Sequence, residues 1–340
     1  MTLAANRAAF TDLAIVPRLL RDVRGGHTRL TLGGTAGGGG EALAHPLLLA
    51  PVAHQRLAHD QAELECARAA QAVEATMVLS TLSSYPLEDV ARLAGRRWFQ
   101  LYFQPRRDVT LDLVRRAHAA GCGAIVVTLD AAIQTPSRRA QEAGFRQPAE
   151  CVAANLQTYP RTAPPEIAAR DSRVFQGAMQ RAPTWDDMAS FVRQSPLPVW
   201  VKGVLHADDA RALRQCGVAG LVVSNHGGRA LDGAPASLRM LPAIRAAVGA
   251  DYPLLLDGGI RSGGDVFKAI ALGADAVLIG RLQVYALAVA GALGVAHMLR
   301  LLREELEVCM AHAGCATLAD VRQATLIRAG AGNAVRDEPC

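Results

Sequence analysis

Lysine is almost absent from this sequence. Of the 36 basic residues only Lys202 and Lys268 are lysines, and all the others are arginines. A guanidinium is a planar fork and an ammonium is a compact point charge, so the two are not equivalent at a binding site. A codon preference for arginine explains the scarcity itself, but a retained lysine is a candidate for a position that needs a compact charge.

Several other features are missing, and each absence excludes a class of protein. The seven cysteines are scattered without a C-x-x-C pair, which argues against a disulfide framework or a zinc site and favours reduced thiols in a cytoplasmic protein. There is no block of five or more basic residues, so we expect no nucleic-acid partner. The longest apolar run, 285–296, is shorter than the roughly 20 residues of a membrane span, and the N-terminus lacks the layout of a signal peptide. We therefore expect no membrane partner and no metal.

What is present is a repeated alternation of short apolar runs and amphipathic segments. Eight runs are continuously apolar, as parallel strands buried on both faces are: 46–53, 76–82, 98–103, 124–130, 198–204, 220–226, 253–259 and 276–281. Amphipathic segments lie between most of them, at 60–73, 87–94, 109–120, 206–215 and 237–248. This order predicts an α/β fold, a (β/α)8 TIM barrel in one domain over 1–340. An open doubly wound sheet is the alternative.

Two segments depart from the repeat. Residues 131–197 hold Pro, Arg and Gln with little periodicity, which predicts a long loop after strand 4 that serves as a lid or binding loop or is disordered. The glycine tract 33–40 precedes the barrel and opens no helix, so it is interpreted as a flexible turn and not a phosphate cradle.

Polar residues gather at the predicted carboxyl ends of the strands, where TIM barrels carry their active sites. In chain order these positions are Ala53, Ser83, Tyr102, Asp130, Lys202, Ser224-Asn225-His226, Asp257-Gly258-Gly259 and Gly280-Arg281. One ring thus collects a base, a carboxylate, a cation, a phenol and glycine-rich turns.

The last two strands predict a phosphate site. The stretch 257–281 places Gly258, Gly259, Gly263 and Gly264 after strand 7, and Gly280 and Arg281 after strand 8. These two loops commonly bind phosphate in such barrels; glycine lets backbone N–H groups approach the oxygens, and Arg261 and Arg281 offer forks. Tight-turn glycines alone are the alternative.

The other strand ends predict the reaction chemistry. His226 is a base suited to neutral pH, Asp130 could orient it, and Arg229 could hold a carboxylate in two contacts. Lys202 would stabilise negative charge that develops on a bound group, with a Schiff-base lysine as the rival interpretation. Lys268 lies in the helix after strand 7 and is interpreted as structural. Base, carboxylate clamp and phosphate-bearing cofactor together point to chemistry at a carbon next to a carboxylate.

These motifs resemble those of the FMN-dependent 2-hydroxy acid oxidase and dehydrogenase family, which includes glycolate oxidase, lactate oxidase, mandelate dehydrogenase and hydroxymandelate oxidase. SNHGGR (224–229), followed by LD after one residue, LDGGIRSGGDVFKAIALGA (256–274) and IGR (279–281) are the most specific matches. ANRAAF (5–10) and APVAHQRLAH (50–59) also fit, so the resemblance covers about residues 6 to 318.

The resemblance implies oxidation of an (S)-2-hydroxy acid to a 2-oxo acid, with oxygen as the expected acceptor. His226 would take the substrate's hydroxyl proton during hydride transfer to the flavin, or its α-proton in a carbanion mechanism, with Asp130 supporting it. Tyr102 and Arg229 would contact the substrate, and Lys202 would face the flavin ring. The remaining residues implied to bind FMN are Pro51, Val52, Ala53, Ser83, Gln100, Thr128, Ser224, Asp257, Gly258, Gly259, Arg261, Gly280 and Arg281. The resemblance also implies a homotetramer.

The sequence departs from the family at a few positions. The family's N-terminal helical segment, with its substrate-contacting tyrosine, is expected to be missing. Ser137 stands where the family has a second carboxylate-binding arginine, so Arg139, or else Arg138, is expected to replace it. Tyr85 stands where glycolate oxidases have tryptophan, and the 50–59 motif is closer to hydroxymandelate oxidases, which keeps an aryl substrate such as a mandelate open. The alternatives are a flavin-binding barrel with weak or lost activity and an FMN barrel of the isopentenyl-diphosphate isomerase type.

Overall fold

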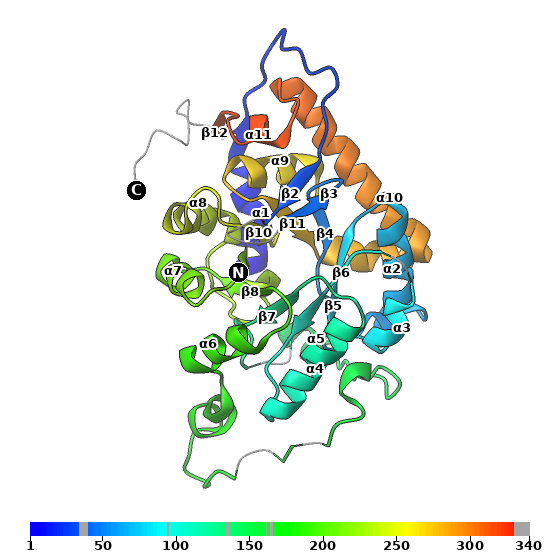
Figure 1. Ribbon diagram of the computed structural model, residues 1–340, viewed down its shortest axis with the longest axis vertical. Helices are drawn as coiled ribbons and strands as arrows, with labels where there is room; N and C mark the ends of the chain where they lie inside the picture. Colours follow the sequence, from blue (N-terminus) through cyan, green and yellow to red (C-terminus); the bar gives the residue numbers. More distant parts are fainter. Residues whose placement is uncertain (34–39, 94, 134–136, 161, 164–165, 330–340) are drawn as a thin grey trace.

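The eight apolar runs form the eight strands of a closed parallel barrel, as predicted (Figure 1). The structure is a computed structural model that describes residues 1–33, 40–93, 95–133, 137–160, 162–163 and 166–329. The barrel strands are β4 (Leu47–Leu49), β5 (Thr76–Ser80), β6 (Arg97–Leu101), β7 (Ile125–Thr128), β8 (Val199–Val204), β9 (Gly220–Val223), β10 (Leu254–Asp257) and β11 (Ala276–Ile279). β11 pairs with β4 and closes the ring, which excludes the open doubly wound sheet.

Helices cover the outside of the barrel because each buries one apolar face on the strands. They are α2 (Ala62–Ala72), α3 (Leu87–Ala91), α4 (Arg107–Ala119), α6 (Trp185–Gln194), α7 (Ala207–Gln215), α8 (Ser237–Val248), α9 (Gly263–Ala271) and α10 (Arg281–Ala313). Outside this repeat, helix α1 (Thr2–Thr11) leads into β1 (Leu13–Ile15), which pairs antiparallel with β12 (Leu326–Arg328) just after α11 (Leu318–Val321).

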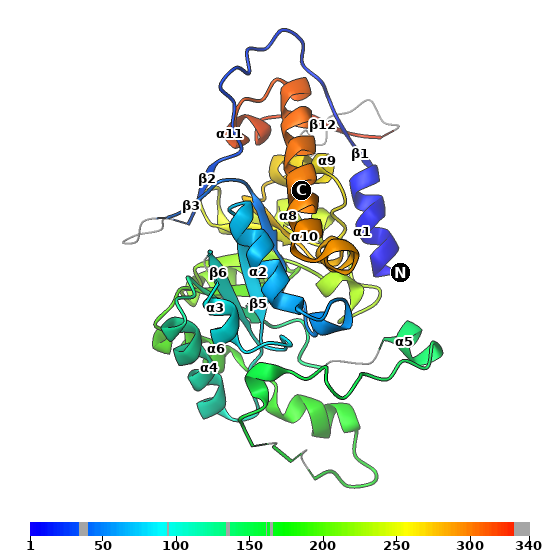
Figure 2. The ribbon, with the colours of Figure 1, turned by 90° about the vertical axis from the view of Figure 1, so that its right-hand side faces the viewer.

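A hairpin that the sequence did not predict lies at the amino-terminal end of the barrel. Strands β2 (Leu30–Leu32) and β3 (Glu41–Leu43) pair antiparallel, and the glycine tract joins them, although residues 34–39 lie outside the described part of the chain. Leu32 and Leu43 pack on a second core inside the barrel. Figure 2 shows the hairpin on one side of the barrel and α1 and α5 on the opposite side. The hairpin therefore does not cover the carboxyl ends of the strands.

The segment after β7 is more structured than its composition indicates. It contains the short helix α5 (Arg138–Glu142), the helical turns η2 (Ala154–Leu156), η3 (Arg173–Gly177) and η4 (Ala178–Arg181), and then α6. The predicted loop therefore ends at about residue 184 and not at 197. Thr184 and Asp187 form a reciprocal capping box at the start of α6, a local signal that the sequence interpretation overlooked.

Helix α10 breaks in the middle. Ala290 and Gly291 leave helical geometry, and Glu65 of α2 accepts the Ala292 N–H at 2.8 Å on the far side of the break. By length and composition α10 could cross a bilayer, the one helix in the described chain of which this is true. Its buried side chains, Leu287, Val295, Leu299, Leu302 and Leu306 among them, belong to the main core, and the broken helix covers the barrel as an outer helix.

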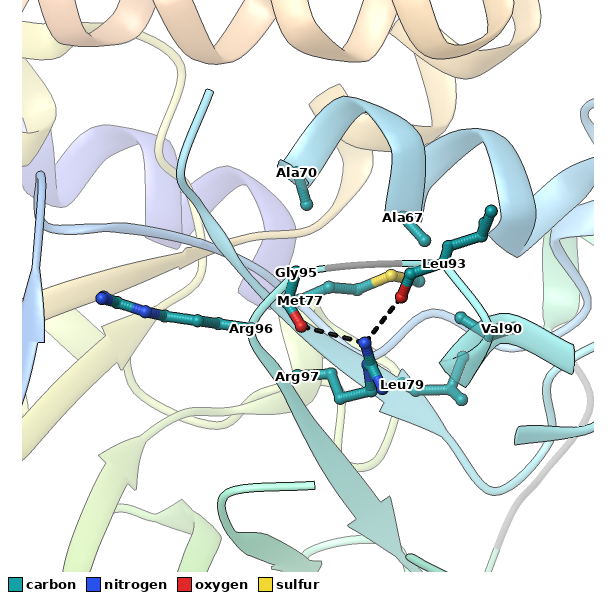
Figure 3. A pocket seen from close by; sticks show the side chains of 9 residues that line it. All are labelled: Ala67, Ala70, Met77, Leu79, Val90, Leu93, Gly95, Arg96 and Arg97. Atoms are coloured by element: carbon teal, nitrogen blue, oxygen red, sulfur yellow. Dashed lines mark hydrogen bonds between the residues drawn. The ribbon is translucent and has the colours of Figure 1, made fainter. Parts of the chain in front are cut away.

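A small void lies within the outer layer, between α2, α3 and the beginnings of β5 and β6 (Figure 3). Its volume is about 10 Å³, the space of one water. Arg97 closes one side by donating to the carbonyls of Leu93 and Gly95 at 2.7 and 3.0 Å. The void is lined mostly by apolar side chains and lies away from the carboxyl ends of the strands, so it is a packing imperfection and not a substrate site.

Candidate active site

His226 and Asp130 meet at the carboxyl end of the barrel although 96 residues separate them. His226 follows β9 and Asp130 follows β7, and the imidazole Nδ1 lies 2.8 Å from the Asp130 Oδ1. A carboxylate only accepts, so Nδ1 donates to it, and in the neutral imidazole Nε2 is then the atom with the free lone pair. The structure thus brings together the predicted base and its supporting carboxylate. Asp130 Oδ2 is buried without a partner among the described residues, so this acceptor would be satisfied by a donor from a bound group.

The approach of Asp130 to β8 depends on a glycine inside that strand. Gly203 has φ +106°, and a Cβ there would lie 2.5 Å from the Asp130 side chain. Any other residue would displace the carboxylate that contacts His226. A β-bulge in the pairing of β8 with β9, between Lys202 and Val204, accommodates the irregular position. Lys202 is predicted on this strand from the sequence, whereas no sequence pattern marks Gly203.

Tyr102 and Arg229 lie within electrostatic reach of this pair. Burial, together with the negative charge of Asp130, raises the pKa of Tyr102 to about 12, and the Arg229 charge opposes the shift. The phenol therefore stays protonated at neutral pH and acts as a hydrogen-bond donor. Arg229 is exposed beside the turn of His226, where its fork is accessible to a small anion.

Lys202 is nearly fully buried and paired. Its Nζ lies 2.8 Å from Asp257 Oδ2 and donates to Ser224 Oγ at 2.7 Å, so three predicted residues from β8, β9 and β10 meet. The other Asp257 oxygen, Oδ1, is buried without a partner in the described chain. A buried ion pair must recover the loss of hydration through good geometry, and an unpartnered oxygen in such a pair is an acceptor that a bound donor would satisfy.

The loops after β10 and β11 concentrate positive charge next to left-handed glycines. Gly258 and Gly259 have φ of +100° and +89°. Burial, and the charges of Arg281 and Arg7, lower the pKa of Arg261. Arg281 donates to the Gly227 carbonyl at 2.8 Å, which ties this charge to the histidine turn. Guanidiniums that repel one another beside glycine-rich backbone form a site that an anionic phosphate would stabilise. Of the other predicted glycines, Gly263 and Gly264 begin α9, and Gly280 precedes α10.

The remaining predicted flavin contacts lie after β4 to β7. Gln100 donates to Thr128 Oγ1 at 3.1 Å, and both are buried at neighbouring strand ends. The Ser83 hydroxyl instead donates to the Tyr85 carbonyl at 2.7 Å and accepts from Asn155, so its own hydrogen is already used within its loop. A half-buried wall is formed by Pro51, Val52 and Ala53.

The residues at the mouth fit a flavin mononucleotide. The arginine cluster suits its phosphate, the free Asp257 oxygen suits a ribityl hydroxyl, and the 51–53 wall with Gln100 and Thr128 suits an apolar ring that has polar edges. Lys202 would supply the compact charge beside that ring, whereas Lys268 donates to the Phe10 carbonyl and holds α9 to α1, as a structural residue does. Arg138 and Arg139 begin α5, but their side chains lie outside the described part of the structure.

Three residues that the sequence interpretation did not single out support this site. Asn6 pairs with Asn225, Arg7 bonds the Gly259 carbonyl and Asp265, and buried Glu63 accepts the N–H groups of Gln55 and Ser84 at 3.3 and 2.9 Å. The motifs ANRAAF (5–10) and 50–59 lie at or beside them, but helix residues far from a strand end show no spacing that would mark them.

The chain is similar to known proteins along almost its whole length. The family model described as FMN-dependent dehydrogenase matches residues 1–328. An L-lactate oxidase of Alicycliphilus denitrificans is 67% identical over 326 residues, which cover 96% of this chain and 88% of that protein. A 4-hydroxymandelate oxidase of Amycolatopsis orientalis is 43% identical over 327 residues, 95% and 88% of the two chains.

Solved structures are similar to it as well. Mandelate oxidase with (S)-2-phenylpropionate superposes with a TM-score of 0.85 at 41% identity, covering 96% of this chain and 90% of that one. A variant of mandelate oxidase with a C4a-OH-FMN adduct has the same TM-score and identity, with 96% and 91% coverage.

Proposed function

The chain belongs to the FMN-dependent dehydrogenase family and is an FMN-dependent 2-hydroxy acid oxidase, and from this premise we propose that it oxidises a small aliphatic (S)-2-hydroxy acid such as L-lactate to its 2-oxo acid, with oxygen as the acceptor. The contact that carries the chemistry is the 2.8 Å approach of His226 to Asp130. The substrate class is supported by the 67% identity to an L-lactate oxidase over 96% of the chain.

Bound FMN supplies the two-electron acceptor of the reaction, and the residues of the chain bind, orient and move a proton. His226 Nε2 accepts a proton from the substrate, and Asp130 stabilises the imidazolium that forms. The protonated Tyr102 hydroxyl donates to a substrate oxygen, and Arg229 binds the carboxylate. Lys202 offsets negative charge beside the ring from within its pair with Asp257.

Tyr85 belongs to the proposed substrate wall. Its hydroxyl donates to the Asp60 carbonyl at 3.2 Å, and Arg56 lies over its ring at 5.4 Å. Because two contacts fix this ring, we expect it to keep its position whichever substrate binds. An aryl substrate such as (S)-mandelate is the second candidate, because a 4-hydroxymandelate oxidase is 43% identical and mandelate oxidase has the same fold. Arg139, or else Arg138, remains the proposed second contact of the carboxylate.

Anaerobic titration tests the proposal. The purified yellow protein is mixed with (S)-lactate, glycolate or (S)-mandelate, and loss of the flavin's visible absorption is followed before oxygen is admitted. Fastest bleaching by (S)-lactate, and recovery in oxygen, are expected. Faster bleaching by (S)-mandelate would establish the aryl class instead, and a protein that no hydroxy acid bleaches would contradict the function.

We also propose a cytoplasmic homotetramer. The exposed side chains Tyr285 and Val289 are spaced four residues apart in the first part of α10, and Leu293 is exposed just after its break, which would place apolar surface between copies. The cysteines in the described chain are free, in keeping with a reducing compartment. Light scattering coupled to gel filtration tests the assembly: a tetramer is expected, and Val289→Glu should lower the mass.

A further inference from the structure

We infer that Asn6, on the N-terminal helix α1, is a positioning residue that fixes the turn carrying His226. The inference rests on the proposed role of His226 as the base. It concerns a residue 219 positions before its partner in the sequence, outside the barrel strands and their loops.

The link is a reciprocal pair of amides. Asn6 Nδ2 donates to Asn225 Oδ1 at 2.9 Å, and Asn225 Nδ2 donates to Asn6 Oδ1 at 2.8 Å. Both side chains are almost completely buried, at 1% and 3% exposure. An amide is the side chain that offers a donor and an acceptor in this planar arrangement, and in a buried site the loss of either bond leaves a polar atom unpaired.

Asn225 is held on several sides at once. Its N–H donates to Ser237 Oγ at 3.1 Å, and its Nδ2 also donates to the Pro235 carbonyl at 2.9 Å. Asn6 Oδ1 accepts the Ser237 N–H at 3.3 Å, so the start of α8 joins the same network. Asn225 is thereby fixed between α1 and α8, immediately before the catalytic histidine.

The next residues have a backbone that needs such support. His226 has φ +55°, in the left-handed region that side chains disfavour, and Gly227 and Gly228 follow at +59° and +76°. The His226 N–H donates to Ser224 Oγ at 3.0 Å, so contacts on Ser224 and Asn225 precede three left-handed residues. A strained conformation persists where its surroundings enforce it, and this one directs the imidazole to Asp130.

Helix α1 also contacts the neighbouring loop of the proposed flavin site. A Cβ on Gly258 would lie 3.2 Å from Asn6 Nδ2, and one on Gly259 would lie 2.6 Å from the Asn6 carbonyl oxygen. Asn6 therefore lies against the turn of the base and against the loop after β10. This contact sets the relative position of the two loops between which the reaction takes place.

Asn6→Asp tests the inference with little change in shape. The carboxylate still accepts from Asn225 and Ser237, but it loses the donor and faces Asn225 Oδ1 with negative charge. Tyr252→Phe is the matched control, because the buried Tyr252 hydroxyl donates to the Val218 carbonyl at 2.5 Å, near the amino-terminal ends of the strands. For each variant FMN content, thermal unfolding, the rate of anaerobic flavin reduction by (S)-lactate across pH, and the rate of reoxidation by oxygen are measured.

We expect Asn6→Asp to retain FMN and to unfold within a few degrees of Tyr252→Phe. Its flavin should be reduced at least tenfold more slowly than that of wild type, with a displaced pH profile. Its reoxidation rate should be unchanged. Tyr252→Phe should reduce at the wild-type rate. Reduction at the wild-type rate in Asn6→Asp, or full recovery on adding free FMN, would overturn the inference, because the residue would then serve only folding or cofactor retention.

A double-mutant cycle with His226→Ala gives a second, independent test. Asn6→Ser removes the paired contacts without adding charge, and we expect it to slow reduction in the wild-type background but not in the His226→Ala background. An equal slowing in both backgrounds would overturn the inference. Wild-type protein that no 2-hydroxy acid reduces would overturn the proposed function and the inference together, whereas normal wild-type reduction with normal Asn6 variants would overturn the inference alone.

Discussion

Buried carboxylates have fewer partners at the mouth of the barrel than at its amino-terminal end. At the amino-terminal end, Asp275 is paired with Arg245 at 3.0 Å and accepts the Leu254 N–H at 2.8 Å. At the mouth, one oxygen of Asp130 and one of Asp257 are buried with no partner in the described chain. A buried carboxylate oxygen without a donor costs about 1–3 kcal/mol, so these two oxygens at the mouth indicate where a ligand would supply a donor.

The two ends also differ in the residues that line them. Trp98 and Trp200 stack at 4.9 Å inside the barrel, and the Trp98 indole donates to Glu41 of the hairpin at 3.1 Å. The mouth instead has a left-handed histidine and a cluster of mutually repelling arginines. One end is packed for stability and the other is arranged for chemistry, as in barrel enzymes generally.

Replacing His226 should give the largest effect and should confine it to activity. Loss of a general base typically costs 10²–10⁴-fold in turnover, so His226→Ala should lose about that much and keep its yellow colour. Turnover with (S)-lactate and the visible spectrum are the measurements. Turnover near wild type would show that the base is another residue.

Replacing Trp200 should give the opposite result. Trp200→Ala opens a cavity in the core at the amino-terminal end, which typically costs about 3–5 kcal/mol of unfolding free energy. Chemical denaturation should show this loss, while turnover per bound FMN stays within about twofold of wild type, since core variants act on stability and not on transition-state contacts. A large fall in turnover per flavin would show that the two ends are coupled.

Lys202→Arg would sharpen the comparison at fixed charge. The side chain is about 4% exposed, so the larger guanidinium must displace neighbours, at a cost of about 1–3 kcal/mol. We expect flavin reduction to slow by roughly tenfold or more, because the charge moves from Asp257 and Ser224. Anaerobic reduction rates measure this. Lys268→Arg, at the structural lysine, is the control and should reduce normally.

Glu63 gives the smallest effect, which depends on pH. Burial raises the pKa of Glu63, so ionising it destabilises the fold: the stabilisation present below the ordinary carboxyl pKa is lost as pH rises through the raised value. Gln retains the acceptor for the two N–H groups but does not titrate. The Tm of Glu63→Gln minus the Tm of wild type should therefore be larger at about pH 8 than at about pH 4. A difference in Tm that stays constant with pH would show that Glu63 does not titrate in this range.

The sequence predicted the barrel because a strand buried on both faces must be continuously apolar. All eight runs became strands, but most predicted carboxyl ends extended two to three residues too far. The polar residues there, such as Tyr102 and Asp130, lie just beyond the last ladder pair and not within it. The hairpin β2–β3 escaped prediction because its strands have three residues each, too few for an alternation to show.

The site was predicted in its members and only partly in its contacts. Positions at strand ends converge for geometric reasons, so His226, Asp130 and Lys202 could be assigned to one mouth from order alone. Their pairings could not be assigned from the order of the strands. Lys202, for example, was expected to face a cofactor, and the structure shows that it is also in an ion pair with Asp257. Ser83 was expected to bind the flavin, and its hydroxyl donates to the Tyr85 carbonyl.

The sequence by itself determined the barrel, the residue types at its mouth and the family motifs, because strand burial and strand ends follow from local apolar runs. Tertiary structure alone decided which groups touch. The 2.8 Å approach of His226 to Asp130 requires Gly203 to make room, and the pairing of Asn6 with Asn225 requires α1 to lie against the turn that follows β9. Such contacts join residues far apart in the chain, and no local pattern encodes the distance between them.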